Sequence, residues 1–479
     1  MFLVVFGCYG ILNTRQNNMR TSSYNILVNV DSKLNLFAIL NGYTQAFDIV
    51  NKDVYLALKT ERKLEDLPDV ILSKLKKRGY VTPLTKIEEM KLVQGLSDRA
   101  RENHLFQKYN FHFIVSYACN LRCIYCYEDN ILNGCNSLSK KTMTLEQVDK
   151  AFEIITEKDK VNQSSKTIAL YGGEPLLREN YDVISYIVEK GKRIDHTFRV
   201  TSNGYDIDAY AFMLQKNSNL FSFQITVDGV EEIQNQRKPH FKNSDSFMKI
   251  TNNIDFLLKC GIPVNVRINS DLYTINKIHD LLSFFEDKGW YKYKNFRAYC
   301  ALLRQEVDVK QQIQHSQMGQ LDLLKYYNDK IKNKEITERK IFCQDCGTLA
   351  LLKNLLLNRK HLYKGSFCGA QTNNIIFDPF GDLYSCWDVV GLPEHRVGRY
   401  IPDFCIDDTK SIKWFGHRVS DTKCIQCKFV LFCGGGCLAR SLRKSGEISF
   451  GNCNEYPQSF KYLMKTVCKE ILENNYDVL

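Results

Sequence analysis

The sequence predicts an α/β protein built around a parallel sheet, and three observations lead to this fold class. Short apolar, β-prone segments alternate with helical segments between residues 111 and 300. Polar motifs follow directly after several of these expected strands. Cysteines gather near the first quarter of the chain and again in its last quarter. Strands that alternate with helices of this length form a parallel sheet, here a barrel or partial barrel, and the carboxyl ends of its strands present the functional groups.

Length and composition agree with a protein of several globular domains. The chain has 479 residues, 44% of them hydrophobic, and no apolar run long enough to span a membrane. Residues 1–10 are apolar but lack the features of a signal peptide, and Met19 is an alternative start. The motifs divide the chain into an N-terminal extension (1–20), a small α/β region with a linker (21–107), the barrel (108–340), a cysteine-rich region (341–460) and a C-terminal helix (461–479).

The region at residues 21–107 is expected to contain strands followed by short helices. Apolar, β-prone segments lie at 24–30 and 34–40, and the turn pair Asn41-Gly42 follows them. One helix is expected at 53–59, and a second runs from Pro68 to Gly79 with Val70, Ile71, Leu72 and Leu75 on one face. Residues 87–108 are charged and helical, which suggests a bridge to the barrel.

Six strands are expected in the barrel. They lie at residues 111–115, 167–171, 198–201, 221–227, 264–269 and 295–300. Helices are expected between them, for instance at 145–156, 247–259 and 275–287.

Three cysteines, Cys119, Cys123 and Cys126, follow the first of these strands within eight residues. An iron–sulfur cluster that only transfers electrons has four cysteine ligands. Three thiolates without a fourth nearby would leave one iron of such a cluster open to bind another molecule. Catalytic metal sites keep an open position in the same way, whereas structural metal sites are closed. The alternative is a zinc site that lacks its fourth ligand.

The Cys-x3-Cys-x2-Cys spacing, with Tyr125 before the third cysteine, resembles the cluster loop of the radical S-adenosylmethionine (SAM) enzymes. Later motifs continue the resemblance in order, each after an expected strand. They are Gly172-Gly173-Glu174-Pro175, which resembles the GGEP motif, then Ser202-Asn203, Asp228 and Arg237. The resemblance implies a partial (βα)6 barrel in which the three cysteines hold a [4Fe–4S] cluster and the later motifs bind SAM. Arg237 resembles the arginine that meets the SAM carboxylate, but its neighbour Lys238 leaves open which of the two residues stands at that position.

Seven further cysteines follow a second spacing pattern, centred on Cys-x2-Cys-x5-Cys-x3-Cys at residues 424–437. These gaps fit a zinc ribbon poorly, and nothing marks the chain as secreted and disulfide-bonded. The pattern resembles the SPASM domain, which carries two auxiliary [4Fe–4S] clusters. The resemblance implies an outer cluster on Cys424, Cys427, Cys433 and Cys453 and an inner cluster on Cys368, Cys386 and Cys437.

By this resemblance the inner cluster is one ligand short, because relatives often place another cysteine about six residues after the first, and residues 369–374 contain none. Cys343 or Cys346 could complete the site. The other interpretation is an open iron that binds a cysteine of the substrate.

The region at residues 21–107 resembles the winged-helix-like element with which some radical SAM enzymes bind a peptide leader, by adding it as a strand at a sheet edge. The alternative is a small structural cap. The formal charge of +11 comes from dispersed lysines, so an acidic peptide leader is a better-motivated partner than nucleic acid.

Together these resemblances imply a radical SAM/SPASM maturase of a ribosomally made peptide that forms thioether or other side-chain crosslinks. Three [4Fe–4S] clusters, SAM, a precursor peptide and an electron donor such as flavodoxin or ferredoxin are the expected cofactors and partners. Eighteen cysteines without secretion features favour a reducing cytoplasm, with no membrane association. The alternatives are an anaerobic sulfatase-maturating enzyme, a peptide epimerase and a non-catalytic protein with structural metal sites.

Overall fold

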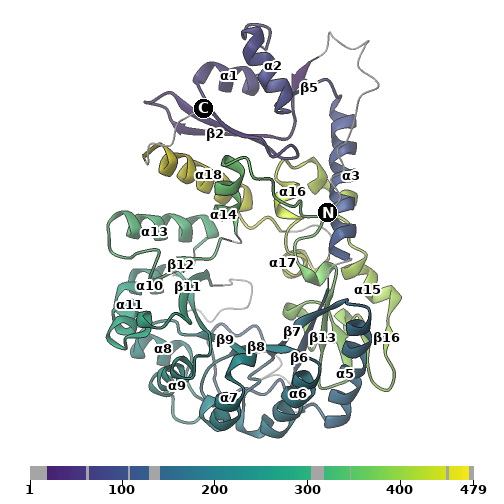
Figure 1. Ribbon diagram of the computed structural model, residues 1–479, viewed down its shortest axis with the longest axis vertical. Coiled ribbons are helices and arrows are strands. Elements are labelled where there is room, and N and C mark those ends of the chain that lie inside the picture. Colours follow the sequence, from purple (N-terminus) through teal and green to yellow (C-terminus); the bar gives the residue numbers. More distant parts are fainter. Residues whose placement is uncertain are drawn as a thin grey trace.

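The computed structural model describes residues 19–60, 64–105, 108–128, 141–303, 318–345, 347–448 and 452–473. Most of the expected N-terminal extension, and Cys346, lie outside the described residues. Figure 1 shows the small N-terminal domain at the top and the large sheet with its helices at the bottom.

Six parallel strands form the centre of the molecule, as the sequence predicts. They are β6 (Tyr109–Ile114), β7 (Ser164–Tyr171), β8 (Thr197–Ser202), β9 (Phe221–Thr226), β10 (Val264–Ser270) and β11 (Phe296–Leu302). They pair in chain order, and among the described residues β6 and β11 do not pair with each other, so the sheet is open. Their alternate residues are buried, and the strands pack on the helices through a continuous apolar core.

Helices follow these strands and cover the outside of the sheet (Figure 1). They are α5 (Leu145–Lys160), α6 (Tyr181–Arg193), α7 (Ala211–Lys216), α8 (Glu231–Arg237), α9 (Phe247–Lys259), α10 (Leu272–Asn276) and α11 (Ile278–Asp287). A capping box starts α5, where the Thr144 side chain accepts from the Gln147 amide and the Gln147 side chain accepts from the Thr144 amide.

The sheet continues across the boundary expected at residue 340. At one end β12 (Phe342–Cys343) pairs in parallel with β11, and at the other end β13 (Asn374–Phe377) pairs in parallel with β6. The strands β14 (Asp382–Tyr384), β15 (Gly398–Arg399) and β16 (Cys405–Ile406) then extend it antiparallel. The cysteine-rich region is therefore joined to the central sheet by backbone hydrogen bonds.

The remaining helices surround the space between the sheet and the N-terminal domain (Figure 1). They are α13 (Gln320–Lys332), α14 (Thr348–Leu356), α15 (Asp408–Phe415), α16 (Val430–Cys433), α17 (Leu438–Ser445) and α18 (Tyr456–Glu473). The C-terminal helix thus begins five residues before the expected boundary. Of the helices in the described ranges, none is long and apolar enough to cross a membrane.

The N-terminal domain contains two small antiparallel sheets and three helices. The sheets are β2 (Asn25–Asp31), β3 (Leu36–Asn41) and β4 (Phe47–Val50), and β1 (Arg20–Thr21) with β5 (Val81–Thr82). The helices are α1 (Lys52–Thr60), α2 (Asp69–Lys77) and α3 (Lys86–Leu105).

Two details of this domain differ from the sequence prediction. The turn before β3 extends to Asn35, whose positive φ of 58° ends the connection, so β3 starts at Leu36. The side chain of Val70 is not on the buried face of α2 but is 67% exposed, whereas Leu75 is 5% exposed. Successive helix residues turn by about 100°, so Val70, Ile71 and Leu72 cannot all face the core.

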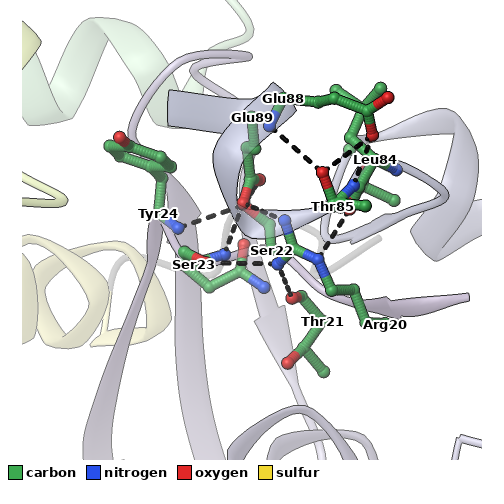
Figure 2. A network of polar contacts seen from close by, with 12 residues as sticks. Arg20, Thr21, Ser22, Ser23, Tyr24, Leu84, Thr85, Glu88 and Glu89 are labelled. Atoms are coloured by element: carbon green, nitrogen blue, oxygen red, sulfur yellow. Dashed lines mark hydrogen bonds and ion pairs between the residues drawn. The ribbon is translucent and has the colours of Figure 1, made fainter. Parts of the chain in front are cut away.

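A buried carboxylate fastens the start of the chain to α3. Glu89 of α3 is fully buried and accepts hydrogen bonds from Arg20 Nη2 at 2.7 Å, Ser22 Oγ at 2.5 Å and the Ser23 amide at 3.0 Å (Figure 2). Each donor lies in the first residues of the domain. The network therefore sets the direction in which α3 leaves the N-terminal domain.

Candidate active site

A cavity of about 250 Å³ lies at the carboxyl ends of the central strands, where a parallel α/β sheet presents its functional groups. Cys119, Cys123 and Cys126 line it, in the loop after β6. The motifs after β7 and β8 line the same cavity. The structure thus brings together the cysteine trio, Tyr125, Gly172, Gly173, Glu174, Ser202 and Asn203.

The three thiols repel one another as thiolates. Burial and the neighbouring Cys123 raise the pKa of Cys119 and of Cys126, and burial raises the pKa of Cys123 to about 11. A bound metal reverses this balance, because it stabilises the thiolate directly. Among the described residues, no three His, Cys, Asp or Glu side chains are arranged to hold a metal ion. Three thiols beside an open cavity fit a larger group, a cluster with one iron free for another ligand.

Gly172 and Gly173 are required by the close approach of the cysteine loop. A Cβ at Gly173 would lie 2.3 Å from the Tyr117 carbonyl oxygen and 2.4 Å from that of Ala118. Gly172 has a φ of +129°, in the region that favours glycine. The amide of Glu174 donates to the Ala118 carbonyl at 2.8 Å. The two glycines therefore let the loop after β7 hold the cysteine loop, a role that the motif alone does not reveal.

Glu174 connects the loops after β7 and β8. Its carboxylate accepts from Ser202 Oγ at 2.8 Å, the Asn203 amide at 2.6 Å and the Leu176 amide at 2.9 Å. Burial nevertheless raises its pKa to about 7, against the hydrogen bonds that lower it. A cationic group in the cavity would therefore stabilise the carboxylate, which fits the amino group that the motif predicts there.

Asn203 contacts the cysteine loop directly. Its Nδ2 atom donates to Asn120 Oδ1 at 2.7 Å and lies 3.7 Å from the sulfur of Cys119. Asn203, which follows β8, thereby supports Cys119, the first of the three expected cluster ligands.

Arg237 and Asp228 do not line the cavity, and their contact with SAM stays a prediction. Arg237 is 4% exposed and pairs with Asp228 at 3.3 Å and Asp271 at 2.8 Å, and its guanidinium lies over the Tyr125 ring. Both aspartates are buried, so the Arg237 charge is paired inside the protein, while its Nη2 atom has no hydrogen-bond partner among the described residues. Lys238 lines the cavity instead, with its Nζ on the Thr226 carbonyl at 2.6 Å.

The segment that contains Arg237 supports the cysteine loop from behind. The Ile124 amide donates to the Arg237 carbonyl at 3.0 Å, and the Arg122 amide donates to the Pro239 carbonyl at 2.9 Å. Tyr125 donates to the Asp228 carboxylate. Arg237 and Asp228 are therefore positioning residues for the loop.

Part of the cavity lining consists of residues that the motifs do not predict. Gln224 and Thr226 on β9 and Arg267 and Asn269 on β10 are among them. Polar residues at every second position of a buried strand are the signal that could have identified these four. No local pattern identifies the further lining residues Tyr127, Glu128, Tyr171, Leu303, Trp387 and Arg443.

Glu128 is a second carboxylate in this cavity. It is 2% exposed, and burial raises its pKa to about 7. Its Oε1 atom has no hydrogen-bond partner in the described ranges. The cavity therefore offers a buried acceptor within reach of a bound substrate.

The seven downstream cysteines fall into the two expected groups. The charges of Cys424 and Cys453 both act on Cys427 and on Cys433, whose pKa burial raises to about 12. The charges of Cys368 and Cys437 act on Cys386. These interactions support an outer set of four thiols and an inner set of three.

The neighbour of Cys343 in the structure is Cys300. The two residues pair across the sheet, and the charges that act on Cys343 after burial are those of Cys300 and Asp345. Asn374 starts β13 and accepts a hydrogen bond from Asn110. Completion of the inner set by Cys343 or Cys346 stays a prediction, and Cys346 lies outside the described residues.

Comparisons with known proteins agree with this site. Residues 113–286 match the family model of the radical SAM superfamily. The chain is 24% identical over 369 residues to a cysteine-type anaerobic sulfatase-maturating enzyme of Clostridium perfringens, which covers 72% of this chain and 92% of that protein. It is 22% identical over 380 residues to the radical SAM cyclopropyl synthase TigE of Paramaledivibacter caminithermalis, covering 74% of this chain and 73% of that one.

Solved structures share the fold at low sequence identity. The structure of anSMEcpe with bound AdoMet matches with a TM-score of 0.57 at 18% identity, over 77% of this chain and 96% of that one. Streptococcus suis SuiB bound to its precursor peptide SuiA matches with a TM-score of 0.54 at 13% identity, over 91% and 98%. Taken with the cysteine loop and its supporting motifs, the match over residues 113–286 identifies a radical SAM domain in this chain.

Proposed function

We propose that this radical SAM enzyme modifies a ribosomally made precursor peptide and installs a thioether or another side-chain crosslink. The observation that carries the proposal is the composition of the cavity. The cysteine trio and the motifs after β7 and β8 line it together with Trp387 and Arg443 from the cysteine-rich region. Trp387 directly follows Cys386, and Arg443 lies on α17, which begins after Cys437. A substrate in the cavity would thus contact elements next to the trio and elements next to two thiols of the expected inner set.

The residues of the chain fit the cofactors that this chemistry requires. Cys119, Cys123 and Cys126 would hold the first cluster, Glu174 would accept from the amino group of SAM, and Asn203 would keep the cysteine loop in place. When bound, the cluster and SAM supply a 5′-deoxyadenosyl radical that removes a hydrogen atom from the substrate, and the two further clusters would accept the electron that ring closure releases. The protein contributes position, and the buried walls exclude water.

The inner set of thiols supports the thioether form of the proposal. Three thiolates, Cys368, Cys386 and Cys437, would leave one iron of a [4Fe–4S] cluster without a protein ligand. Cys343 contacts Cys300 rather than this set, and Cys346 lies outside the described residues. A cysteine thiolate of the substrate has the chemistry to fill that position, beside the carbon to which its sulfur would be joined.

The test is anaerobic coexpression with any short peptide gene found next to the gene of this enzyme, followed by tandem mass spectrometry. We expect the peptide to lose two hydrogens for each ring, and the bridged residues to resist fragmentation between them. The triple variant Cys119→Ala, Cys123→Ala, Cys126→Ala should form neither product nor 5′-deoxyadenosine. An unchanged peptide mass with reversed stereochemistry would contradict crosslinking and indicate epimerisation.

The match to the sulfatase-maturating enzyme favours one further candidate, oxidation of a cysteine or serine to formylglycine. The same experiment separates the two functions, because formylglycine carries an aldehyde that a hydrazide reagent labels. A ring without an aldehyde does not react.

A further inference from the structure

A second cavity, of about 700 Å³, lies between the N-terminal domain and the segment after α14. We call it the basic cleft, after its five basic residues, Lys74, Lys77, Arg78, Arg359 and Lys360. No acidic residue lines it. Its volume lies within the range of about 300–1,000 Å³ that is usual for sites of small ligands. The cleft shares no residue with the cavity that the cysteine trio lines.

Most of the positive charge in the basic cleft is not neutralised by the protein. Arg78 is the exception, because it pairs with Asp48 and also donates to Asn358 Oδ1 at 3.3 Å, across the cleft. The side chains of Lys74, Lys77, Arg359 and Lys360 form no ion pair with any residue that the structure describes, and all four are exposed. Four like charges at one site repel each other, and a ligand of opposite charge relieves this repulsion.

Helix dipoles explain only part of this arrangement. The basic cleft lies at the C-terminal ends of α2 and α14, where cations are favourable. Each helix end carries about half a negative charge, so the two ends offset about one of the four charges. About three positive charges therefore remain for a ligand.

The walls of the basic cleft are fixed in place by the turn between β3 and β4. The side chain of Gln45, which is 6% exposed, donates to the His361 carbonyl at 2.6 Å and accepts from the His361 amide at 2.7 Å. Tyr363 donates to the Tyr43 carbonyl. The Thr44 hydroxyl donates to the Arg78 carbonyl at 2.8 Å. Both walls are thus attached to one turn, and a ligand would not have to order them on binding.

We propose that the basic cleft binds an acidic segment of the precursor peptide. The inference rests on the proposed function, which makes a peptide the substrate. Tyr43, Ala46 and Tyr363 line the cleft beside the basic side chains, so it offers apolar contacts that a peptide side chain can use and a free phosphate cannot. Its location on the N-terminal domain, apart from the cavity of the cysteine trio, suits a segment that holds the substrate without being modified.

Fluorescence anisotropy of the cluster-loaded enzyme tests this site with a defined probe. The probe is a hexaglutamate peptide with fluorescein at its N-terminus and a blocked C-terminus, and the matched hexaglutamine peptide is its control. We expect the hexaglutamate peptide to bind and the hexaglutamine peptide not to bind. Raising the salt from about 0.05 M to about 0.3 M should weaken binding, because the cleft is open to solvent and its charges are screened.

Two double variants separate the basic cleft from the general positive field of the protein. Lys77→Glu/Lys360→Glu reverses two charges in the cleft and should weaken probe binding at least tenfold. Lys52→Glu/Lys76→Glu makes the same change of charge at exposed residues of α1 and α2 that do not line the cleft, and should change binding less than twofold. Thermal unfolding of both variants shows whether they fold like the parent.

Several outcomes would overturn the proposal. Equal losses in the two double variants would mean that the net charge, and not the cleft, attracts the probe. Equal affinity for single-stranded DNA of the same charge would indicate a polyanion site without preference for peptide. The binding measurement requires no SAM cleavage, so its failure is distinguishable from a failure of the crosslinking experiment above.

Discussion

Single residues of the molecule often have a role that their motif does not state. Gly173 is part of a motif associated with SAM, yet the structure shows that a Cβ there would collide with the backbone of the cysteine loop. Arg237 carries a charge suited to a carboxylate ligand, yet it is held between two aspartates. For both residues the structure adds contacts within the protein that the motif does not state.

The buried carboxyl group of Asp378 is expected to make the stability of the protein depend on pH. It is 1% exposed and accepts from the Phe380 and Asp382 amides, each at 2.9 Å, but burial still raises its pKa to about 7. Between pH 4 and pH 7 the folded protein therefore keeps a proton that the unfolded chain has released. Stability falls as pH rises through this window, by up to about 1.4 kcal/mol per pH unit from this one group.

We expect Asp378→Asn to flatten this part of the stability profile, since an amide does not ionise. Thermal unfolding midpoints of variant and parent should be similar near pH 4 and diverge in favour of the variant toward pH 8. Asp407→Asn is the control, because Asp407 is an exposed helix cap whose pKa is lowered by the Thr409 side chain and by backbone amides. Parallel profiles for Asp378→Asn and the parent would contradict the prediction.

At the scale of elements, α3 connects the N-terminal domain to the rest of the molecule. Thr85 and Glu88 form a capping box at its start, with the Thr85 amide donating to Glu88 at 2.8 Å and the Glu88 amide donating to Thr85 at 3.2 Å. Glu89, the next residue, faces the other way and is buried among donors of the first strand (Figure 2). Neighbouring glutamates on one helix thus have different roles.

We expect Glu89→Gln to weaken the attachment of the N-terminal domain strongly, because an amide nitrogen would face donors and Arg20 would lose its counter-charge. The expected loss is about 3 kcal/mol in the free energy of unfolding, measured by chemical denaturation. Glu88→Gln is the matched control and should cost less than about 0.5 kcal/mol, since glutamine also completes a capping box. Similar losses in both variants would show that the buried network does not stabilise the junction.

At the scale of the whole molecule, the N-terminal domain packs against the loop that holds the outer cysteines. The Tyr24 hydroxyl donates to the Ile425 carbonyl at 2.8 Å, and Lys428 Nζ donates to the Asn25 carbonyl at 3.2 Å. A Cβ on Gly42 would lie 2.3 Å from the Lys428 carbonyl oxygen. A structural role for this domain is therefore compatible with the peptide-binding role proposed for it.

Gly42→Ala should disturb the outer cluster, because the displaced Lys428 backbone is next to Cys427. A chain with three cubane clusters contains about twelve irons, and we expect this variant to contain about eight. Gly95→Ala in the middle of α3 is the control, since its new methyl group would make only an ordinary contact with Arg99. Iron analysis of reconstituted protein measures both, and an iron content of about twelve in Gly42→Ala would refute the coupling.

Much of the fold and part of the site were predictable because they depend on local or periodic patterns. The six central strands, the cysteine trio and the motifs after β7 and β8 were assigned from residues adjacent in the chain. They meet in space because parallel strands end at one edge of the sheet. The grouping of the seven downstream cysteines is implied by the resemblance to the SPASM domain and stays a prediction, with which the electrostatic interactions among the thiols agree.

The sequence by itself therefore determined the radical SAM domain and its cysteine trio, which the family match covers. Only the tertiary structure decided which residues complete and support that site. Lys238 rather than Arg237 lines the cavity, Trp387 and Arg443 line it as well, and Lys428 contacts Asn25. Such contacts join residues up to 403 positions apart, and they depend on how whole elements pack, so no local pattern encodes them. The basic cleft belongs to the same class, because its lining comes from two segments that lie far apart in the chain.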